Sequence, residues 1–500
     1  MRVKSLLMPM LVLVSAIPLG ASPQEGCTGL LSLNLQDVQI TAAELLHADK
    51  RTGLPEYCDV VGTIRETIGV EVRMPTNWNQ KMYFGGNGGF AGNIEDTWLG
   101  LSRGYATIST DTGHQNFVVD ASWALDDRVA ERDYGYVAVH KSAILGKIII
   151  EAYYKRSPKF SYFDGCSNGG RQALMEAQKY PADFDGIVAG APALDWTGLM
   201  IGFNWDMQAL QATETTSLIS AEQFLIIADA VLEECDAIDG LVDGLVNDPR
   251  KCHFKPEKLL CMENANTNCL SQLQVDALKK ISSGPKDSTG NLLHPGFPMG
   301  ALVSDFGWIS WLVYNPDYPA VQFLFQNDFF RYMAFTKDNP NFDWKTFNFD
   351  TDPQRMRLMS RILNATNADL SRFHQLGGKL LMYHGWSDSA VPPGRTIEYY
   401  RKVRKHLGAQ NTSTTVRLFM VPGMLHCGGG PGPSYVDYLT VLEQWVEEGV
   451  VPVSMEARHD DNKGIPDRTR PLCPYPMVAR YNGSGSINKA ANFTCVAPPK

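Results

Sequence analysis

The sequence FSYFDGCSNGGRQALMEAQKY, residues 160–180, is the most informative part of this chain. It begins with a short apolar run that is typical of a strand and ends with a segment of helical spacing. Between them, residues 165–169 read GCSNG and fit the pattern G-x-S-x-G. In that pattern a sharp strand-to-helix turn exposes the serine hydroxyl at a helix N-terminus, where the helix dipole favours negative charge. Ser167 is therefore the predicted nucleophile.

Strand and helix patterns alternate on both sides of this turn. Strands are predicted at residues 69–74, 81–84, 105–110 and 187–189, and helices at 134–154 and 169–180. After a long interruption, strands are predicted at 379–383 and 416–421, and helices at 396–407 and 435–448. Such alternation predicts an α/β fold with a mostly parallel sheet and helices on its faces.

The alternation is lost between residues 195 and 369. This stretch contains four cysteines, an acidic loop and an aromatic-rich segment with Trp308, Trp311, Phe329, Phe330 and Tyr332. At 500 residues the chain is long enough for more than one domain. We interpret residues 195–369 as an inserted lid domain over one end of the sheet, and residues 22–194 and 370–500 as the catalytic domain.

A serine nucleophile needs a base that is oriented by an acid. In this class of fold the acid and then the histidine follow the serine along the chain, in loops at the carboxyl ends of strands. Asp388 follows the strand predicted to end at residue 383, and His426 follows the strand predicted to end at residue 421. Taken singly, either residue could be a helix cap or a loop residue, but their order favours a catalytic triad with Ser167.

Two further features surround this predicted triad. Cys166 precedes the serine and Cys427 follows the histidine, so an assembled triad would bring the two cysteines close enough for a disulfide. An oxyanion hole needs two backbone N–H donors. Asn168, directly after the nucleophile, is one expected donor, and the glycine run at residues 85–89 is the expected source of the other, with Gly86 as the predicted residue.

The N-terminus and the composition indicate a secreted, extracellular protein. Residues 1–21 resemble a signal peptide, with Arg2 and Lys4 before an apolar stretch and small residues near its end. The ten cysteines, all beyond the signal, read as a disulfide set. The sequons at Asn364, Asn411, Asn482 and Asn492 are candidate glycosylation sites.

The charge and hydropathy patterns exclude several classes of partner. The net charge is −9 and no Lys/Arg-rich run is present, which argues against nucleic acid and anionic membranes as partners. No segment after the signal has about 18 consecutive apolar residues, so no membrane span is expected. The sequence does not indicate an oligomeric state.

The set Cys166-Ser167, Asp388 and His426-Cys427 resembles the tannase/feruloyl esterase family of α/β-hydrolases, most closely its feruloyl esterase B-like members. The resemblance implies an α/β-hydrolase fold and a secreted serine carboxylesterase that acts through an acyl-enzyme. The implied substrates are esters of aromatic, hydroxycinnamic acids, such as the feruloyl-polysaccharide esters of plant cell walls. A tannase, which hydrolyses galloyl esters, is the alternative enzyme. A non-catalytic secreted binding protein on a hydrolase scaffold is disfavoured because all three triad residues are present.

The same resemblance implies a structural calcium site in the lid. Residues 235–245 read CDAIDGLVDGL and are similar to the calcium loop of the family. The implied ligands are the carboxylates of Asp236, Asp239 and Asp243 and the main-chain carbonyls of Leu241 and Leu245. Such hard oxygen ligands suit Ca²⁺. An acidic surface loop without a metal is the alternative.

The resemblance also implies five disulfides, which cysteine spacing alone does not select. The implied pairs are Cys27 with Cys58, Cys166 with Cys427, Cys235 with Cys252, Cys261 with Cys269, and Cys473 with Cys495.

Overall fold

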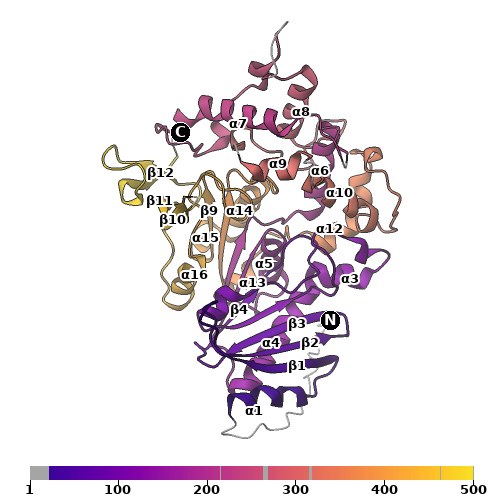
Figure 1. The fold of residues 1–500 in the computed structure, drawn as a ribbon, viewed down its shortest axis with the longest axis vertical. Coiled ribbons are helices and arrows are strands. Elements are labelled where there is room, and N and C mark those ends of the chain that lie inside the picture. The colour runs from indigo at the N-terminus through magenta and orange to yellow at the C-terminus, as the bar shows by residue number, and fades with distance from the viewer. Residues whose placement is uncertain are drawn as a thin grey trace.

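The structure is a computed structural model that describes residues 22–213, 215–262, 268–303, 305–314, 318–461 and 463–498. The predicted signal peptide, residues 1–21, lies outside the described residues. Figure 1 shows a central sheet with the N-terminal strands at one end of the molecule and a helical region at the other. Across the described ranges, no helix is both long and apolar enough to cross a membrane.

Nine strands form the central sheet in the order β1-β2-β3-β5-β4-β6-β7-β8-β9. The strands β4 to β9 are parallel to their neighbours within this group, while β1, β2 and β3 are antiparallel additions at one side. Their bounds are β1 Val38–Leu46, β2 Tyr57–Ile64, β3 Ile68–Pro75, β4 Lys81–Gly85, β5 Ala106–Thr110, β6 Phe160–Cys166, β7 Gly186–Gly190, β8 Lys379–Gly385 and β9 Val416–Val421. The predicted α/β class is confirmed, and every predicted strand corresponds to one of β3 to β9.

The strands β1 and β2 have no counterpart among the predicted strands. β1 is an edge strand in which only Ala43 is buried, so its sequence lacks the apolar run that marks the central strands. β7 and β8 are buried almost throughout because parallel strands in such a sheet are covered on both faces.

Helices cover both faces of the sheet. α4 (Ala138–Tyr154), α5 (Asn168–Lys179) and α14 (Gly394–Leu407) share one apolar core with one face of the strands. α16 (Tyr438–Glu447) packs on the opposite face through Leu442 and Trp445. The predicted helix at residues 134–154 begins as a π-helical turn, Asp133–Val137, that continues into α4. The short helices α1 Pro23–Thr28, α2 Trp98–Ser102, α3 Arg128–Arg132, α13 Ser371–Gln375 and α15 Ala409–Thr415 complete this part.

The segment between β7 and β8 is helical where it is described and contributes no strand to the three sheets. Its helices are α6 Trp196–Ala209, α7 Ala221–Cys235, α8 Gln272–Ser283, α9 Phe306–Leu312, α10 Val321–Tyr332, α11 Asp352–Arg355 and α12 Arg357–Leu363. Two apolar clusters hold it together, one around α7, α8 and α9 and one around α6, α10 and α12. This arrangement suits the predicted lid domain, whose boundaries at residues 195 and 369 stay a prediction.

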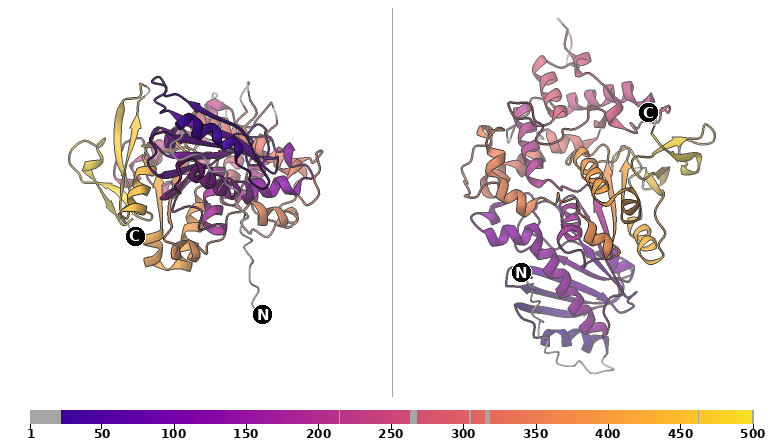
Figure 2. Two further views of the ribbon diagram at one scale, coloured as in Figure 1. Left: turned by 90° about the horizontal axis from the view of Figure 1, so that it is seen from below. Right: turned by 180° about the vertical axis from the view of Figure 1, so that it is seen from behind.

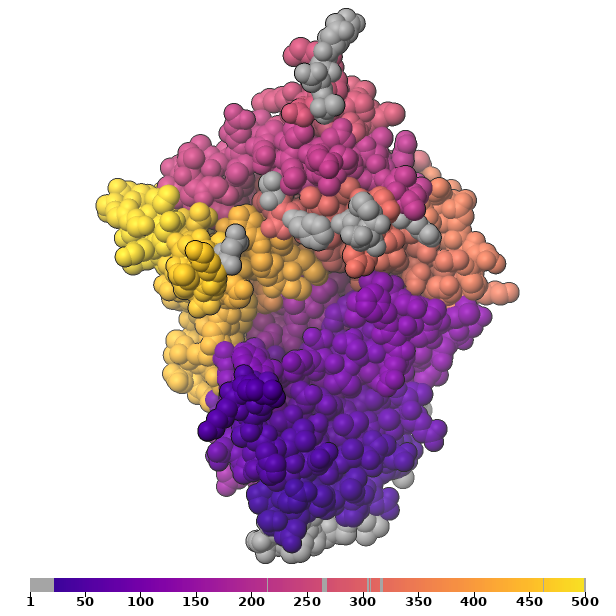
Figure 3. Space-filling model, viewed as in Figure 1, coloured from indigo at the N-terminus to yellow at the C-terminus, as the bar shows by residue number. Residues whose placement is uncertain are grey.

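The C-terminal residues form two small hairpins that contact the helical segment. The hairpin strands are β10 Met455–Asp460, β11 Pro466–Leu472, β12 Val478–Tyr481 and β13 Phe493–Val496. Figure 2 shows this part, in yellow, at the flank of the molecule, and Figure 3 shows it against the magenta helical segment. An ion pair of 2.5 Å joins Arg470 on β11 to Asp243. The hairpins therefore tie the end of the chain to the predicted lid.

Candidate active site

Ser167 lies in the sharp turn between β6 and α5. Its backbone has φ 65° and ψ −121°, and a positive φ costs free energy in a residue other than glycine. The Ser167 N–H donates to the Gly190 carbonyl at 3.0 Å and helps to hold this conformation. The flanking glycines are required by close packing, since an added Cβ at Gly165 would lie 2.7 Å from the carbonyl carbon of Gly169. The turn has the geometry of a nucleophile elbow.

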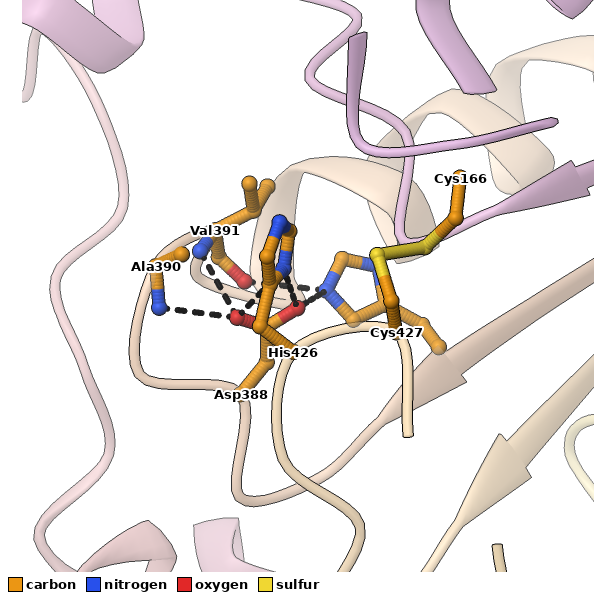
Figure 4. The surroundings of a disulfide bond; sticks show 7 residues. Cys166, Asp388, Ala390, Val391, His426 and Cys427 are labelled. Atoms are coloured by element: carbon orange, nitrogen blue, oxygen red, sulfur yellow. Dashed lines mark hydrogen bonds and ion pairs between the residues drawn. A yellow bond between two sulfur atoms is a disulfide. The ribbon is translucent and has the colours of Figure 1, made fainter. Parts of the chain in front are cut away.

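Asp388 and His426 meet at the carboxyl ends of β8 and β9 (Figure 4). Nδ1 of His426 lies 2.9 Å from Oδ2 and 3.1 Å from Oδ1 of Asp388. An ionised carboxylate only accepts hydrogen bonds, so Nδ1 carries the hydrogen and Nε2 is left free to accept a proton. Asp388 is fully buried, whereas 14% of the His426 side chain is exposed. The pair thus has the arrangement of the acid and base of a catalytic triad.

A disulfide joins Cys166 to Cys427, whose Cα atoms lie 5.9 Å apart (Figure 4). Because Cys166 precedes Ser167 and Cys427 follows His426, the bridge holds the nucleophile turn and the histidine loop at the same edge of the sheet. The structure therefore gathers all three residues of the predicted triad at this edge.

The carboxylate of Asp388 is surrounded by donors. Oδ1 accepts hydrogen bonds from the N–H groups of Ala390 and Val391, each at 2.8 Å. Oδ2 lies 3.1 Å from Nε2 of the fully buried His384. Burial acts to raise the pKa of Asp388, but the charge of His426 and the hydrogen bonds from His384 and His426 outweigh it and lower the pKa. The carboxylate is therefore ionised at neutral pH.

His384 is a residue of the site that the sequence pattern did not reveal. Its Nε2 also lies 2.9 Å from the Val391 carbonyl, and because both partners of Nε2 are acceptors, this nitrogen carries a hydrogen. Its Nδ1 lies 2.9 Å from Oγ1 of Thr396 on α14. The only signal in the sequence is the spacing of four residues between His384 and Asp388, which does not by itself predict a contact.

The two predicted oxyanion donors differ in their availability. The Asn168 N–H begins α5 and has no hydrogen-bond partner among the described residues, as an oxyanion donor requires. The Gly86 N–H donates instead to the Asp164 carbonyl at 2.9 Å, which extends the ladder between β4 and β6. The prediction that Gly86 supplies a free donor is thus contradicted. Gly88 lies in open space within the same loop, and no described residue accepts a hydrogen bond from its N–H.

An aromatic side chain of the helical segment lies against the predicted base. The ring of Trp311 on α9 meets the His426 imidazole edge to face, with ring centroids 5.5 Å apart. The ring of Phe325 on α10 stacks on the ring of Trp311, with centroids 5.9 Å apart. Trp308, in contrast, is fully buried, and its Nε1 donates to the Ser387 carbonyl next to Asp388. Of these two tryptophans, Trp311 is the one beside the site.

The predicted calcium loop has features that fit a cation. Four of the five predicted ligand residues, Asp239, Leu241, Asp243 and Leu245, line one cavity of about 320 Å³. Oδ1 of Asp243 is buried without a hydrogen-bond partner in the described structure. Asp236 lies at the base of the loop, where its carboxylate accepts the N–H groups of Asp243 and Gly244. The loop therefore offers oxygen atoms that its own hydrogen bonds leave unused.

Another group of ligand-type side chains lies outside the triad. Among the described residues, His140, Glu176 and Asp183 form the only trio whose ligand atoms lie within 4.8 Å of one another. They belong to α4, to the second half of α5 and to the loop before β7, whereas the nucleophile turn begins α5. The carboxylates of the predicted calcium loop are more widely spaced than this, so main-chain oxygens would have to complete their set.

The remaining four disulfides of the structure are also pairs that the resemblance implied. They join Cys27 to Cys58, Cys235 to Cys252, Cys261 to Cys269, and Cys473 to Cys495. No cysteine is free in the described part of the chain.

The four sequons differ in how accessible their amides are. Asn411 and Asn482 are exposed. The Nδ2 of Asn364 donates to Oδ1 of Asp195 at 2.8 Å, and the Nδ2 of Asn492 donates to the Ser486 carbonyl at 2.8 Å. A glycan on either of these two amides would replace an existing hydrogen bond.

Comparisons with known proteins agree with this geometry. A family model described as tannase and feruloyl esterase matches residues 52–496. The chain is 37% identical to an uncharacterized esterase of Xanthomonas campestris pv. campestris, over 98% of this chain and 94% of the relative. It is 34% identical to mono(2-hydroxyethyl) terephthalate hydrolase of Piscinibacter sakaiensis, over 89% of this chain and 86% of the relative. The solved structure of feruloyl esterase B from Aspergillus oryzae superimposes with a TM-score of 0.85 at 26% identity, covering 95% of this chain and all of that one, 100%.

Proposed function

From the premise that this chain belongs to the tannase and feruloyl esterase family, we propose a reaction for its site. The chain is a carboxylic ester hydrolase. We assign to it the hydrolysis of aromatic acid esters through an acyl-enzyme, with Ser167, Asp388 and His426 as the triad. The observation that carries this assignment is the hydrogen-bonded pair of Asp388 and His426, which the Cys166–Cys427 bridge fastens to the nucleophile turn.

The triad acts in two half-reactions. Oγ of Ser167 attacks the ester carbonyl while Nε2 of His426 takes the hydroxyl proton. Nε2 then gives that proton to the leaving alcohol. Water, activated by the same nitrogen, hydrolyses the acyl-enzyme and restores the serine. Asp388 keeps Nδ1 protonated and stabilises the imidazolium, which its lowered pKa allows throughout the neutral range.

The oxyanion of each tetrahedral intermediate is held by backbone donors. The Asn168 N–H is one, at the N-terminus of α5 where the helix dipole adds to its effect. We assign the second to the loop at residues 86–89, with Gly88 in place of Gly86 because the Gly86 N–H is already bonded to Asp164.

The substrates we propose are esters of hydroxycinnamic acids, including feruloyl esters of plant cell-wall polysaccharide. Trp311 supports an aromatic acid, since its ring stands next to His426 and is positioned to contact a planar acyl group. Two other aromatic ester classes are relevant: galloyl esters, the substrates of the tannases that the family description names, and the terephthalate half-ester in the name of one relative. A galloyl ester is the second candidate for this chain.

Three further properties belong to the proposal: calcium binding, secretion and glycosylation. The carboxylates of Asp236, Asp239 and Asp243 and the carbonyls of Leu241 and Leu245 would hold Ca²⁺, which supplies structural cross-linking of the loop and no chemistry at the triad. We propose that the protein is secreted, which is supported by the signal-like residues 1–21 and by five disulfides, since disulfides persist in oxidising compartments. Glycosylation is expected first at the exposed Asn411 and Asn482.

A panel of methyl ferulate, methyl gallate, mono(2-hydroxyethyl) terephthalate and p-nitrophenyl acetate tests this function. The Ser167→Ala variant should lose turnover by several orders of magnitude on every ester that the wild type hydrolyses. The Ser157→Ala variant is the control, because Ser157 is exposed before β6, at the opposite end of that strand. A fluorophosphonate should label Ser167 in the peptide map.

The outcomes separate the candidates. Preference for methyl ferulate in kcat/KM supports the hydroxycinnamoyl assignment, and preference for methyl gallate replaces it with a tannase activity. Retained turnover in folded Ser167→Ala, or labelling of a different residue, overturns the triad.

A further inference from the structure

Arg171 on α5 is fully buried, and within the described residues it has no acidic partner. Its Nε donates to Oδ1 of Asn168 at 2.8 Å, and its other nitrogens donate to the carbonyls of Gly135, Leu363 and Tyr134 at 2.9 to 3.1 Å. Every one of these acceptors is neutral. Burial lowers the pKa of the guanidinium, and the only side chain that offsets this effect is the phenol of Tyr134.

A buried charge without a counter-ion is expensive, and protein structures rarely keep one for stability alone. Arginine remains protonated even in such surroundings. Two aromatic rings make cation–π contacts with this charge: the guanidinium lies 4.6 Å from the ring centroid of Tyr134 and 5.5 Å from that of Trp196. These contacts reduce the cost of burial, but they leave a net positive charge inside the protein.

The position of this charge relates it to the nucleophile turn. Arg171 is one helical turn beyond Ser167, and its N–H donates to the Ser167 carbonyl at 3.0 Å. Its side chain returns toward the start of α5, where Nε fixes the amide of Asn168. The guanidinium is thus hydrogen-bonded to the side chain of Asn168, the residue whose backbone N–H we assign to the oxyanion.

The Asn168 side chain carries this contact on to the glycine loop. Its Oδ1 accepts a hydrogen bond from Nε of Arg171 at 2.8 Å and lies 3.1 Å from the hydroxyl of Tyr134, whose single hydrogen it shares with the Gly89 carbonyl. With Oδ1 committed in this way, Nδ2 faces the loop and donates to the Asn87 carbonyl at 3.2 Å. The Tyr134 hydroxyl also lies 2.9 Å from the Gly89 carbonyl. One network therefore fixes both segments that carry the assigned oxyanion donors.

We propose that Arg171 is a positioning residue for ester hydrolysis, which sets the oxyanion donors through Asn168 and supplies a buried positive charge to the developing oxyanion. This inference rests on the proposed function, because it concerns the same triad. This role explains why Arg171 has no counter-ion among the described residues. A carboxylate beside it would cancel the positive electrostatic potential that stabilises an oxyanion. The tetrahedral intermediate places a negative charge in this region transiently, and the positive charge of Arg171 is already in position to stabilise it.

A structural role for Arg171 is the competing explanation, since its carbonyl partners lie on α12 and on the π-helical turn. Such a role lowers stability when it is removed and leaves the chemistry of the remaining folded enzyme unchanged. A role at the oxyanion lowers kcat while KM stays within about twofold, because the charge acts in the transition state. The two explanations therefore differ in a measurable way.

The test compares Arg171→Lys, Arg171→Met and Tyr134→Phe with the wild type. We measure kcat and KM on p-nitrophenyl acetate, inhibition by phenylboronic acid, which forms a tetrahedral anionic adduct with the serine, and the melting temperature. We expect kcat to fall by about a hundredfold in Arg171→Met and by about tenfold in Arg171→Lys, which keeps the charge but not the hydrogen bonds. The boronic acid inhibition constant should rise in parallel with the loss of kcat. Tyr134→Phe should lower kcat by about fivefold, because only one of the bonds to Asn168 is lost.

The control is Arg73→Met on β3. Arg73 is half-buried and pairs with Glu71 at 2.9 Å, so its loss should lower the melting temperature without changing kcat or boronic acid binding. If Arg171→Met does not fold, Arg171→Lys and Tyr134→Phe decide the question. Wild-type kcat and boronic acid affinity in both of these folded variants would overturn the proposal. A wild-type protein that hydrolyses none of the esters contradicts the proposed function itself, and this outcome is recognised before any Arg171 variant is made.

Discussion

Cys166 and Cys427 are joined by a disulfide although 261 residues of sequence separate them. Cys166 directly precedes the proposed nucleophile Ser167 and Cys427 directly follows the proposed base His426, so a single covalent link fixes the two loops that carry them. Triad chemistry does not require this link, because serine hydrolases in general assemble the same geometry without it. We therefore attribute a positional role to the bridge.

Replacing both Cys166 and Cys427 by alanine should lower kcat by about a hundredfold, beyond any loss of folded protein. The reason is that a displacement of about 1 Å between nucleophile and base costs about this factor. Replacing Cys473 and Cys495 is the matched comparison, since that bridge lies among the C-terminal hairpins and should affect mainly the melting temperature. Steady-state kinetics, with kcat calculated per folded molecule, measure the two losses. Equal losses of kcat in the two double variants would contradict a positional role for the Cys166–Cys427 bridge.

His384 should orient Asp388. Its Nε2 lies 3.1 Å from Oδ2, the same oxygen that His426 approaches most closely. His384→Leu removes this donor and should lower kcat by about tenfold with little change in KM, because Oδ2 then keeps only its contact with His426. His384→Gln can still donate and should recover part of the loss. Identical kinetics for the Leu and Gln variants would show that the hydrogen bond has no role.

The carboxylate of Asp388 should contribute to stability in a pH-dependent way. Its pKa is lower in the folded state than the value of about 3.9 expected in the unfolded chain. The stabilisation is therefore fully present above about pH 4 and is lost as the pH falls below it. Urea unfolding of the wild type and Asp388→Asn should give a difference that is largest at pH 7 and shrinks toward pH 3. A difference that grows toward acid pH contradicts the lowered pKa.

Asp388→Asn should in addition lower kcat by about four orders of magnitude, because an amide cannot hold Nδ1 of His426 in its protonated form. Turnover of the chromogenic ester at pH 7 measures this loss. A decrease of less than tenfold would assign the role of the acid to another residue.

Calcium should raise the melting temperature, and a chelator should lower it. At a free calcium concentration of 100 times Kd, binding to the folded state should raise the free energy of unfolding by about 2.7 kcal/mol. Asp243→Asn should abolish the response, since Oδ1 of this residue is the buried oxygen without a partner. Asp350→Asn, at an exposed position, is the control. If elemental analysis of the purified protein finds no calcium and the wild type shows no response, the loop is acidic surface only.

Much of the fold and the pairing of Asp388 with His426 could be predicted because the signals are local. The nucleophile turn, the strands β3 to β9 and the order of Ser167, Asp388 and His426 depend on short stretches of sequence. β1 could not be predicted in this way, since an edge strand with one buried residue has almost no apolar pattern. β1 is identified as a strand through its antiparallel pairing with β2, which in turn pairs with β3.

The inner parts of the site depend on three-dimensional contacts that no spacing encodes. Arg171, Gln172 and Glu176 are polar residues on a helix and would ordinarily face solvent, yet all three are buried because α5 is enclosed between the sheet and its neighbours. The sequence also does not show which glycine of the 85–89 loop has a free N–H. It depends on how far the ladder between β4 and β6 continues, and that ladder takes the N–H of Gly86.

The long separation within the Cys166–Cys427 pair also has a consequence for biosynthesis. The other four bridges join cysteines at most 31 residues apart, so each can close soon after its second member leaves the ribosome. Cys166 has to wait for its partner while Cys235, Cys252, Cys261 and Cys269 emerge and compete for it. Maturation in an oxidising compartment then requires thiol–disulfide exchange to correct premature pairs, which takes seconds to hours depending on the isomerase. Co-expression with a disulfide isomerase should therefore increase the active fraction of this enzyme, as measured by fluorophosphonate labelling of Ser167, more than it increases the total yield.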